Sequence, residues 1–260
     1  MPKAREAALA ALRLDDSLAE AHAVLGFIHL IYDWDGPAAK RELERAIQLN
    51  PSLAVARTNY AAYLSTQGRL DESVREVRRA ISLDPLSLRA HADGASLLLF
   101  ARRNDEAIQL AGKGIALEPN FAFGFVFQGV GYGEQGRFGE AVRSLERAAR
   151  LDRSATIVAL GAHVHAIAGQ KDEALRLIRE VEENAQKRYF CPYEIGTAYV
   201  SLRDPDTAYK WFRKGIEDRA DCMAWLGIEP WIDPFRSDPR YAQLLRDVGL
   251  APVTATNRPR

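Results

Sequence analysis

The chain has 260 residues, and its 35 Lys and Arg residues balance its 35 Asp and Glu residues. A chain of this length can bury a sizeable core, while its even charge argues against nucleic acid or an anionic membrane surface as a direct partner. The sequence contains no run of about eighteen apolar residues that could cross a bilayer. Charges at Arg5, Glu6 and Arg13 interrupt the place where a signal peptide would have its apolar core, so we expect a cytoplasmic protein.

The opening stretch, MPKAREAALAALRLDD, predicts a helix within residues 1–17. Ala4, Ala8, Leu9 and Leu12 recur at helical spacing and form one apolar face. A single helix cannot bury such a face by itself, so the helix needs either a neighbour in the chain or another molecule.

From residue 18 to residue 220, a small residue recurs at an almost constant interval. These positions, spaced 34, 34, 34, 33 and 34 residues apart, are Ala39, Ser73, Ala107, Ala141, Ala174 and Ala208. A period of this length indicates a solenoid in which each unit buries its apolar face against its neighbours. We therefore predict six helix pairs, over residues 18–52, 53–86, 87–120, 121–153, 154–187 and 188–220.

The repeat resembles the tetratricopeptide repeat (TPR), and the resemblance covers nearly the whole chain. A large residue followed by a small one recurs in the first helix of several units, in LGFIH, QGVGY and IGTAY. The resemblance implies an all-α fold, a right-handed α-solenoid of antiparallel helix pairs. Gly26, Gly129 and Gly196 would allow the two helices of a pair to approach closely. Residues 1–17 then correspond to the second helix of an incomplete repeat, so we expect the natural protein to continue upstream or this helix to dock on another chain.

Residues 221–250 break the period and predict a C-terminal capping segment. Its final helix should start near Asp238 and stop at Gly249. Its large apolar residues, which we expect to cover the last repeat, are Trp225, Trp231, Phe235 and Leu244. Residues 251–260 predict a disordered tail.

The segments IYDWDGPAAKRELERAIQLNP and DPFRSDPRYAQLLRDVGL narrow the resemblance further. They look like the repeat region at the C-terminus of bacterial multidomain signalling proteins. In such proteins the repeats follow a nucleotide cyclase domain, a Ser/Thr kinase domain or a winged-helix DNA-binding domain.

Two local patterns could in principle bind a metal. Asp33 and Asp35 form an Asp-X-Asp triplet, but hard cations need six or more oxygen ligands and no second acidic cluster accompanies the pair. Asp35 is better placed as the cap of the next helix, with Pro37 in its first turn. His163 and His165 lie two residues apart on a predicted helix and should point to different faces, which favours packing roles.

The remaining chemistry is sparse. Cys191 and Cys222 are too few for a disulfide framework, and we expect both to be reduced packing residues. No nucleophile elbow or Cys-His signature is present, and the glycine-rich GVGYGEQG follows no strand. We therefore expect no enzyme activity, no metal and no cofactor.

A concave groove formed by the first helices is the best candidate binding site. Counting along the period, the positions that face it are Phe27, Thr58, Arg89, Phe123, Val126, His163 and Tyr193. This mixed and partly aromatic surface suits a helix or an apolar peptide of a protein partner, although some of these side chains could instead pack between repeats. The alternative function is structural: self-association through Leu9 and Leu12, giving a homodimer that sets the oligomeric state of an upstream domain.

Overall fold

The structure is a computed structural model, and it describes residues 1–184 and 189–250. The tail predicted over 251–260 and the end of the fifth predicted unit lie outside these residues. Helix α1 (Pro2–Leu14) comes first. The helix pairs that follow in the described residues are α2 (Ala19–Ile28) with α3 (Gly36–Leu49), α4 (Ala54–Thr66) with α5 (Leu70–Leu83), α6 (Leu88–Phe100) with α7 (Asn104–Leu117), α8 (Ala122–Glu134) with α9 (Phe138–Leu151), α10 (Ala155–Ile167) with α11 (Lys171–Asn184), and α12 (Pro192–Ser201) with α13 (Pro205–Glu217).

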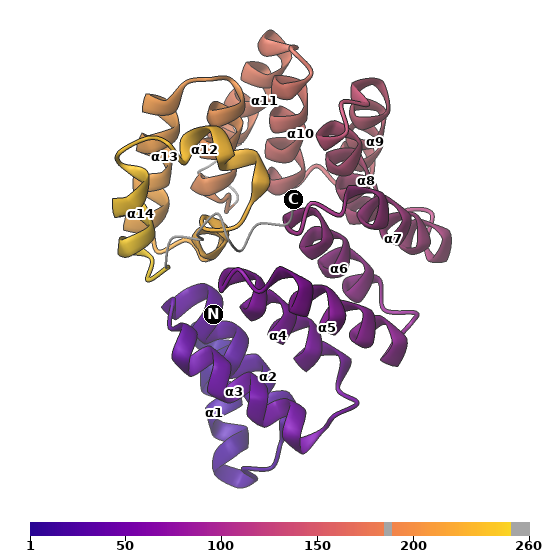
Figure 1. The fold of residues 1–260 in the computed structure, drawn as a ribbon, viewed down its shortest axis with the longest axis vertical. Helices are drawn as coiled ribbons and strands as arrows, with labels where there is room; N and C mark the ends of the chain where they lie inside the picture. The colour runs from indigo at the N-terminus through magenta and orange to yellow at the C-terminus, as the bar shows by residue number, and fades with distance from the viewer. Residues whose placement is uncertain (185–188, 251–260) are drawn as a thin grey trace.

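The pairs follow one another around an arc. In Figure 1, α1–α5 lie at the bottom, α6–α9 continue on the right, and α10–α13 complete the upper part. Each first helix packs on its own second helix and on the first helix of the next pair. The predicted α-solenoid of antiparallel helix pairs is confirmed, because neighbouring units bury the apolar faces that no unit could bury alone.

Glycines in the first helices allow close contact within a pair. A Cβ atom on Gly26 would lie 2.5 Å from Cγ of Leu43, and one on Gly129 would lie 1.9 Å from Cδ2 of Leu145. Each leucine belongs to the second helix of the same pair, so any larger residue would push the two helices apart. The predicted close approach at these glycines is confirmed.

The turn inside each pair ends the first helix with a left-handed residue. Gly68 and Gly136 take this position with φ of 71° and 73°, which glycine adopts at no steric cost. Arg102 and Arg203 occupy the equivalent position in two other pairs, with φ of 58° and 61°. A left-handed conformation costs a residue with a Cβ roughly 1–2 kcal/mol, so these two turns are strained relative to their glycine counterparts.

The Asp-X-Asp triplet separates into two roles. Asp35 accepts a hydrogen bond from the backbone N–H of Ala38 at 2.9 Å and caps α3, as predicted. The carboxylate of Asp33 accepts hydrogen bonds from Arg5 of α1, at 2.6 Å, and pairs with His29, at 2.7 Å. Asp33 therefore ties α1 to the short π-helix η1 (His29–Asp33) that extends α2.

Three short helices follow the last pair: the 3₁₀-helices η2 (Asp221–Trp225) and η3 (Pro230–Phe235), and then α14 (Tyr241–Asp247). Helix α14 packs on α13, where Arg240 lies 4.6 Å from the ring centre of Tyr209 and Arg213 pairs with Asp247. Phe235 packs edge-on against Phe212 of α13, with ring centres 5.2 Å apart. These contacts cover the end of the last pair.

The end of the chain also returns to its first helix pair. Helix η2 contacts η1, and Arg219 lies 5.5 Å from the ring centre of Trp34, the residue that follows η1. A Cβ atom on Gly249 would meet the backbone oxygen of Trp34 at 3.0 Å. The arc of repeats is therefore closed by contacts between its two ends.

The expectation that both cysteines are reduced is wrong in this structure. Cys191, the N-cap residue of α12, forms a disulfide with Cys222 of η2, and their Cα atoms are 6.4 Å apart. This separation lies within the range that a disulfide spans. The number of cysteines could not reveal the pairing, because it depends on how residues after the last repeat fold back onto α12.

Candidate binding groove

The first helices of the six described pairs form one continuous surface, which we call the inner face. It consists of α2, α4, α6, α8, α10 and α12, and each of these contacts the next. Residues 221–235, which we call the C-terminal segment, lie against part of the inner face. The groove predicted from the sequence is therefore partly filled by the chain itself.

Two tryptophans hold the C-terminal segment on the inner face. The rings of Trp225 and Trp231 both lie 5.8 Å, centre to centre, from the ring of Phe100 in α6, and Trp231 lies 5.6 Å from His163 in α10. Arg102, one of the strained turn residues, forms an ion pair with Asp233. The expectation that both tryptophans cover only the last pair needs correction, because they reach across to α6.

A first cavity, which we call the Phe27 cavity, lies between three consecutive units. Its volume is about 70 Å³, and its walls are Phe27, Thr58, Asn59, Ala62, Asp93, Ser96, Leu97, Phe100 and Trp225. The guanidinium of Arg89 lies 5.9 Å from the ring centre of Phe27 and donates a hydrogen bond to Asp93 at 3.0 Å. Burial raises the pKa of the Asp93 carboxyl, although Arg89 opposes this shift.

A second cavity, which we call the Glu194 cavity, adjoins the first and has a volume of about 170 Å³. The residues that line it are Ser96, Phe100, Phe123, Phe127, Val130, Thr156, Leu160, Tyr193, Glu194, Thr197, Cys222, Trp225, Glu229 and Trp231. The two cavities share three walls, so together they run along the inner face from α2 to α12.

Two carboxyl groups line the Glu194 cavity, and each has its pKa raised to about 8. Burial is the main cause for both. The Tyr193 hydroxyl donates a hydrogen bond to Oε2 of Glu229 at 2.6 Å, which partly opposes the shift there. Oε2 of Glu194 is shielded from solvent and has no hydrogen-bond partner.

Five of the seven predicted groove residues lie at these cavities. Phe27 and Thr58 line the first cavity, while Phe123 and Tyr193 line the second. Arg89 is exposed beside Phe27. Thr58 and Tyr193 are nevertheless buried, so the accessible side chains of this set are Phe27, Arg89 and Phe123.

Val126 and His163 do not face an open groove, and their prediction as accessible groove residues is corrected. Val126 is fully buried in the core, because α8 turns Phe123 and Phe127 toward the cavity instead. His163 is buried beneath Trp231, and Nδ1 of its ring shares a hydrogen bond with Oγ of Ser201 at 2.8 Å. Burial lowers the pKa of His163 to about 4, so the ring is neutral near pH 7.

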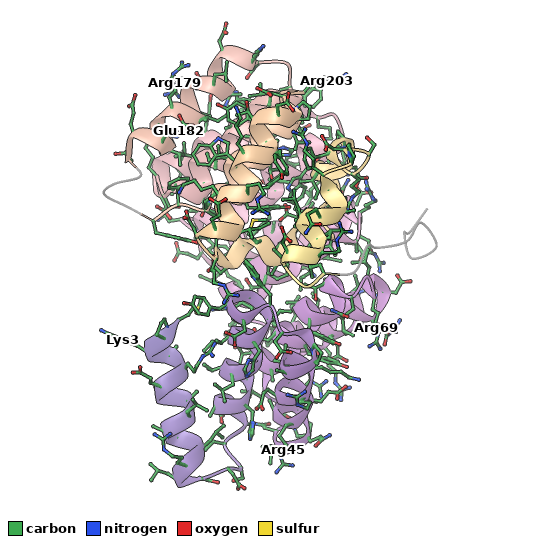
Figure 2. All side chains as sticks on the ribbon, turned by 90° about the vertical axis from the view of Figure 1, so that its left-hand side faces the viewer. Lys3, Arg45, Arg69, Arg179, Glu182 and Arg203 are labelled. Atoms are coloured by element: carbon green, nitrogen blue, oxygen red, sulfur yellow. A yellow bond between two sulfur atoms is a disulfide. The ribbon has the colours of Figure 1, made fainter. Side chains whose placement is uncertain are left out.

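The two predicted self-association residues on α1 differ in exposure. Leu9 is 42% exposed. Leu12 packs with Ala8 and Leu25 and is only partly accessible. Leu14, which we did not single out from the sequence, is 90% exposed. Figure 2 shows α1 at the edge of the molecule, with Lys3 pointing away from the other helices.

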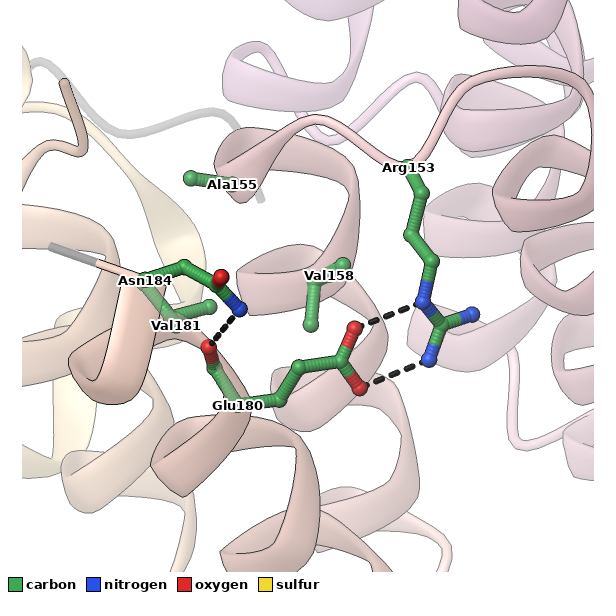
Figure 3. Close-up of a pocket in the computed structure, with 6 residues that line it drawn as sticks. All are labelled: Arg153, Ala155, Val158, Glu180, Val181 and Asn184. Carbon is green, nitrogen blue, oxygen red and sulfur yellow. Dashed lines mark hydrogen bonds and ion pairs between the residues drawn. The ribbon is translucent and has the colours of Figure 1, made fainter. Parts of the chain in front are cut away.

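A further cavity, of about 290 Å³, lies between α10 and α11 (Figure 3), and none of the residues that line it is aromatic. Arg153 donates two hydrogen bonds to the carboxylate of Glu180, both at 2.6 Å. The other walls are Ala155, Val158, Val181 and Asn184. The charges of this cavity are paired with each other, so it offers less to a ligand than the inner face does.

Sequence reasoning missed Glu194 and Glu229 as groove residues. Glu194 stands in CPYEIG near the start of a first helix, where a glutamate is ordinarily solvated and favourable. Residues of α8, α10 and the C-terminal segment surround its carboxyl group, and no local pattern encodes the return of that segment. Trp225 and Trp231 were recognised as apolar covering residues but were assigned to the wrong surface.

The helix pairs and the inner face define a TPR-like helical solenoid. No family model matches the chain, and no match was found among curated proteins. Among solved structures, it is similar to pilF of Pseudomonas aeruginosa, with 21% identity, a TM-score of 0.55 and coverage of 76% of this chain and 90% of that one. A thermophilic TPR protein of Thermus thermophilus, TTC0263, has 19% identity, a TM-score of 0.60 and coverage of 74% of this chain and 96% of that one.

The chain is also similar to the APC/C hetero-tetramer Cut9–Hcn1, with 14% identity and a TM-score of 0.60. That match covers 91% of this chain and 50% of the other. At these identities the likeness shows the fold alone. Among the described residues, no helix is both long and apolar enough to cross a membrane, and no group of three or more His, Cys, Asp or Glu side chains could hold a metal ion.

Proposed function

We propose that the chain is a non-catalytic protein-interaction scaffold that holds a segment of a partner protein on the inner face. The observation that carries this proposal is the Phe27 cavity, an apolar depression built by three consecutive units. Phe27 itself is half-buried, and the exposed Arg89 stands beside it. A pre-formed surface of this kind supports binding, because little conformational entropy is lost when a partner docks.

The partner segment that fits best is a helix or extended peptide with one aliphatic side chain as its anchor. A cavity of about 70 Å³ accepts such a side chain, and Arg89 is already paired with Asp93, which leaves little net charge to attract an acidic tail. We also propose, from the resemblance of the repeats, that the scaffold belongs to a bacterial signalling or transcription-regulatory protein.

The test is a selection of peptides from a displayed helical library against the whole chain, followed by affinity measurements on two variants. Phe27→Glu places a charge at the cavity, whereas the matched Val24→Glu changes an exposed residue on the same helix outside it. We expect selected peptides to bind the first variant at least about tenfold more weakly, a loss of about 1.4 kcal/mol, and the second normally. Selected peptides that bind Phe27→Glu as tightly as the unchanged chain would contradict the proposal.

Self-association is a second candidate function, and the exposed leucines of α1 favour it. Leu9 and Leu14 are 42% and 90% exposed, while the opposite face of the helix packs on α2. Light scattering of the chain should show a dimer that Leu9→Glu combined with Leu14→Glu dissociates. Leu86→Glu, at a leucine that is 73% exposed elsewhere, is the control. A monomer at all concentrations removes this candidate.

A further inference from the structure

We propose that the Glu194 cavity is a binding site for an organic cation, an alkylammonium group held by aromatic walls and a buried carboxylate. This site is separate from the Phe27 cavity, and the proposal does not depend on the scaffold function. Three properties of the cavity lead to it: its aromatic walls, its two carboxyl groups with no basic residue in the lining, and one carboxyl oxygen without a hydrogen-bond partner.

The walls of the cavity are suited to an organic cation. The aromatic residues among them are Phe100, Phe123, Phe127, Tyr193, Trp225 and Trp231. The faces of such rings carry partial negative charge and attract ammonium groups, most strongly when water is excluded. The lining residues include two glutamates and no Lys, Arg or His. The lining therefore provides apolar contact and two carboxyl groups that can ionise beside a bound cation, without a cation of its own.

Glu194 supplies the oxygen that lacks a partner. Its Oε2 has no solvent exposure and receives no hydrogen bond, although buried polar atoms in folded proteins are almost always satisfied. Glu229 differs, because the Tyr193 hydroxyl already donates to it. An N–H donor in the cavity would satisfy Glu194 without disturbing that bond.

Other ligand classes fit less well. A hard metal ion needs six or more oxygen ligands, and the two carboxyls lie among aromatic walls. A neutral apolar molecule would fill the cavity but would leave Oε2 of Glu194 unsatisfied. An alkylammonium ion places its positive charge beside the Glu194 carboxylate and its apolar body against the rings, and about 170 Å³ has room for tetramethylammonium or n-butylammonium. Only n-butylammonium also brings N–H donors for Oε2 of Glu194, whereas tetramethylammonium offers charge and apolar contact alone.

Protonation gives the site a distinctive pH dependence. Burial raises the pKa of Glu194 to about 8, with Asp221 adding to the shift and Thr156 opposing it. The pKa of Glu229 is also about 8, raised by burial and by Glu194 and opposed by Tyr193, Trp231 and Arg236. Both carboxyl groups therefore keep their protons at pH 7, and a cation that binds must displace one of them. Binding should strengthen as the pH rises from 6 to 8 and then level off.

The test is calorimetric titration of the whole chain with tetramethylammonium chloride and with n-butylammonium chloride at pH 6 and pH 8. Tetramethylammonium carries no titrating proton, so any pH dependence belongs to the protein. The fluorescence of Trp225 and Trp231 gives a second signal at the cavity itself. The neutral analogue 1-butanol controls for apolar contact alone.

We expect saturable binding of both cations, tighter at pH 8, with 1-butanol at least about tenfold weaker. Glu194→Gln should weaken cation binding by about tenfold or more, equivalent to at least about 1.4 kcal/mol. The matched control is Glu134→Gln, because Glu134 is a carboxyl with its pKa raised by burial that does not line the cavity. This variant should bind normally.

The same titration with an acetylated, amidated lysine peptide separates two sources of the cation. A peptide that binds with Glu194 dependence, and more tightly than n-butylammonium, identifies a lysine side chain of a protein as the source. A peptide that binds more weakly identifies a free amine. Absence of saturable binding by either cation at pH 8, equal binding of 1-butanol, or unchanged binding by Glu194→Gln would overturn the proposal.

Discussion

Changing Glu229 to Gln should make the protein more stable near neutral pH. Glu229 is 6% exposed, and the pKa of its carboxyl group is raised to about 8, mainly by burial, from an ordinary value of 4.5. At pH 7 the folded protein keeps the proton on this group, whereas the unfolded chain has lost it. Unfolding is therefore favoured by the ionisation that becomes possible once the carboxyl reaches water.

The size of the effect follows from the difference between the two pKa values. In the unfolded chain Glu229 has its ordinary pKa of 4.5, which lies ~2.5 units below pH 7. At about 1.4 kcal/mol per unit, the group destabilises the fold by about 3 kcal/mol at this pH. Because the folded pKa of Glu229 is raised, this group leaves the fold undisturbed below about pH 4.5 and destabilises it increasingly as the pH rises to about 8. Glutamine does not ionise, yet its oxygen can still accept the Tyr193 hydrogen bond, so the variant should escape this loss.

Urea unfolding followed by circular dichroism at pH 5 and pH 8 measures the effect. The fall in unfolding free energy between these two pH values should be smaller in Glu229→Gln by about 3–4 kcal/mol. Glu194 remains in the variant, so its own contribution to the pH-dependent fall in unfolding free energy is unchanged. The control is Glu146→Gln, whose carboxylate is exposed. If the native protein and Glu229→Gln show the same pH dependence, Glu229 is not held protonated in the fold and the reasoning is refuted.

Three further changes test the packing. Gly129→Ala should lower the free energy of unfolding by about 1–3 kcal/mol in a thermal melt, since its new Cβ would lie 1.9 Å from a leucine of the paired helix. The control is Gly139→Ala, at an exposed helical site, which should be neutral or slightly stabilising. Trp231→Ala should cost about 3–5 kcal/mol and make the C-terminal segment susceptible to limited proteolysis; an unchanged digestion pattern would argue against its docking role. Reduction of the Cys191–Cys222 disulfide should lower stability by about 3–4 kcal/mol, and Cys222→Ser should reproduce the loss without reductant.

The helix pairs were predictable because their packing constrains the sequence at regular intervals. Ala39, Ala107 and Ala141 recur at the period and are all fully buried, and glycines such as Gly129 stand where two helices touch. A larger residue at any of these points would separate the helices, so each unit repeats the same small residues. The Asp35 cap was predictable for a different reason: the carboxylate bonds to the backbone only three residues further on, so the local sequence is enough to indicate it.

The return of the C-terminal segment could not be predicted in this way. Its contacts join residues that are far apart in the sequence, as in the ion pair of Arg102 with Asp233. Neither residue by itself indicates which partner it will meet in the fold. Arg102 stands at a turn where three other units have glycine, but Arg203 occupies the same position in the last pair, so this substitution alone does not mark the contact. The burial of Glu194 and the pairing of the cysteines both follow from this return, which explains why they were missed as well.

The closure of the arc also sets the order in which the protein can fold. Contacts within a helix pair join neighbouring parts of the chain and form fast, while contacts between η1 and η2 must wait for the closure of a loop that runs from α3 to α13. We expect refolding to show an early phase, in which helices form, and a slower one, in which tryptophan fluorescence changes as Trp225 and Trp231 dock. During synthesis the inner face stays uncovered until residues 221–235 emerge from the ribosome, so the nascent chain passes through an open form that the finished protein hides.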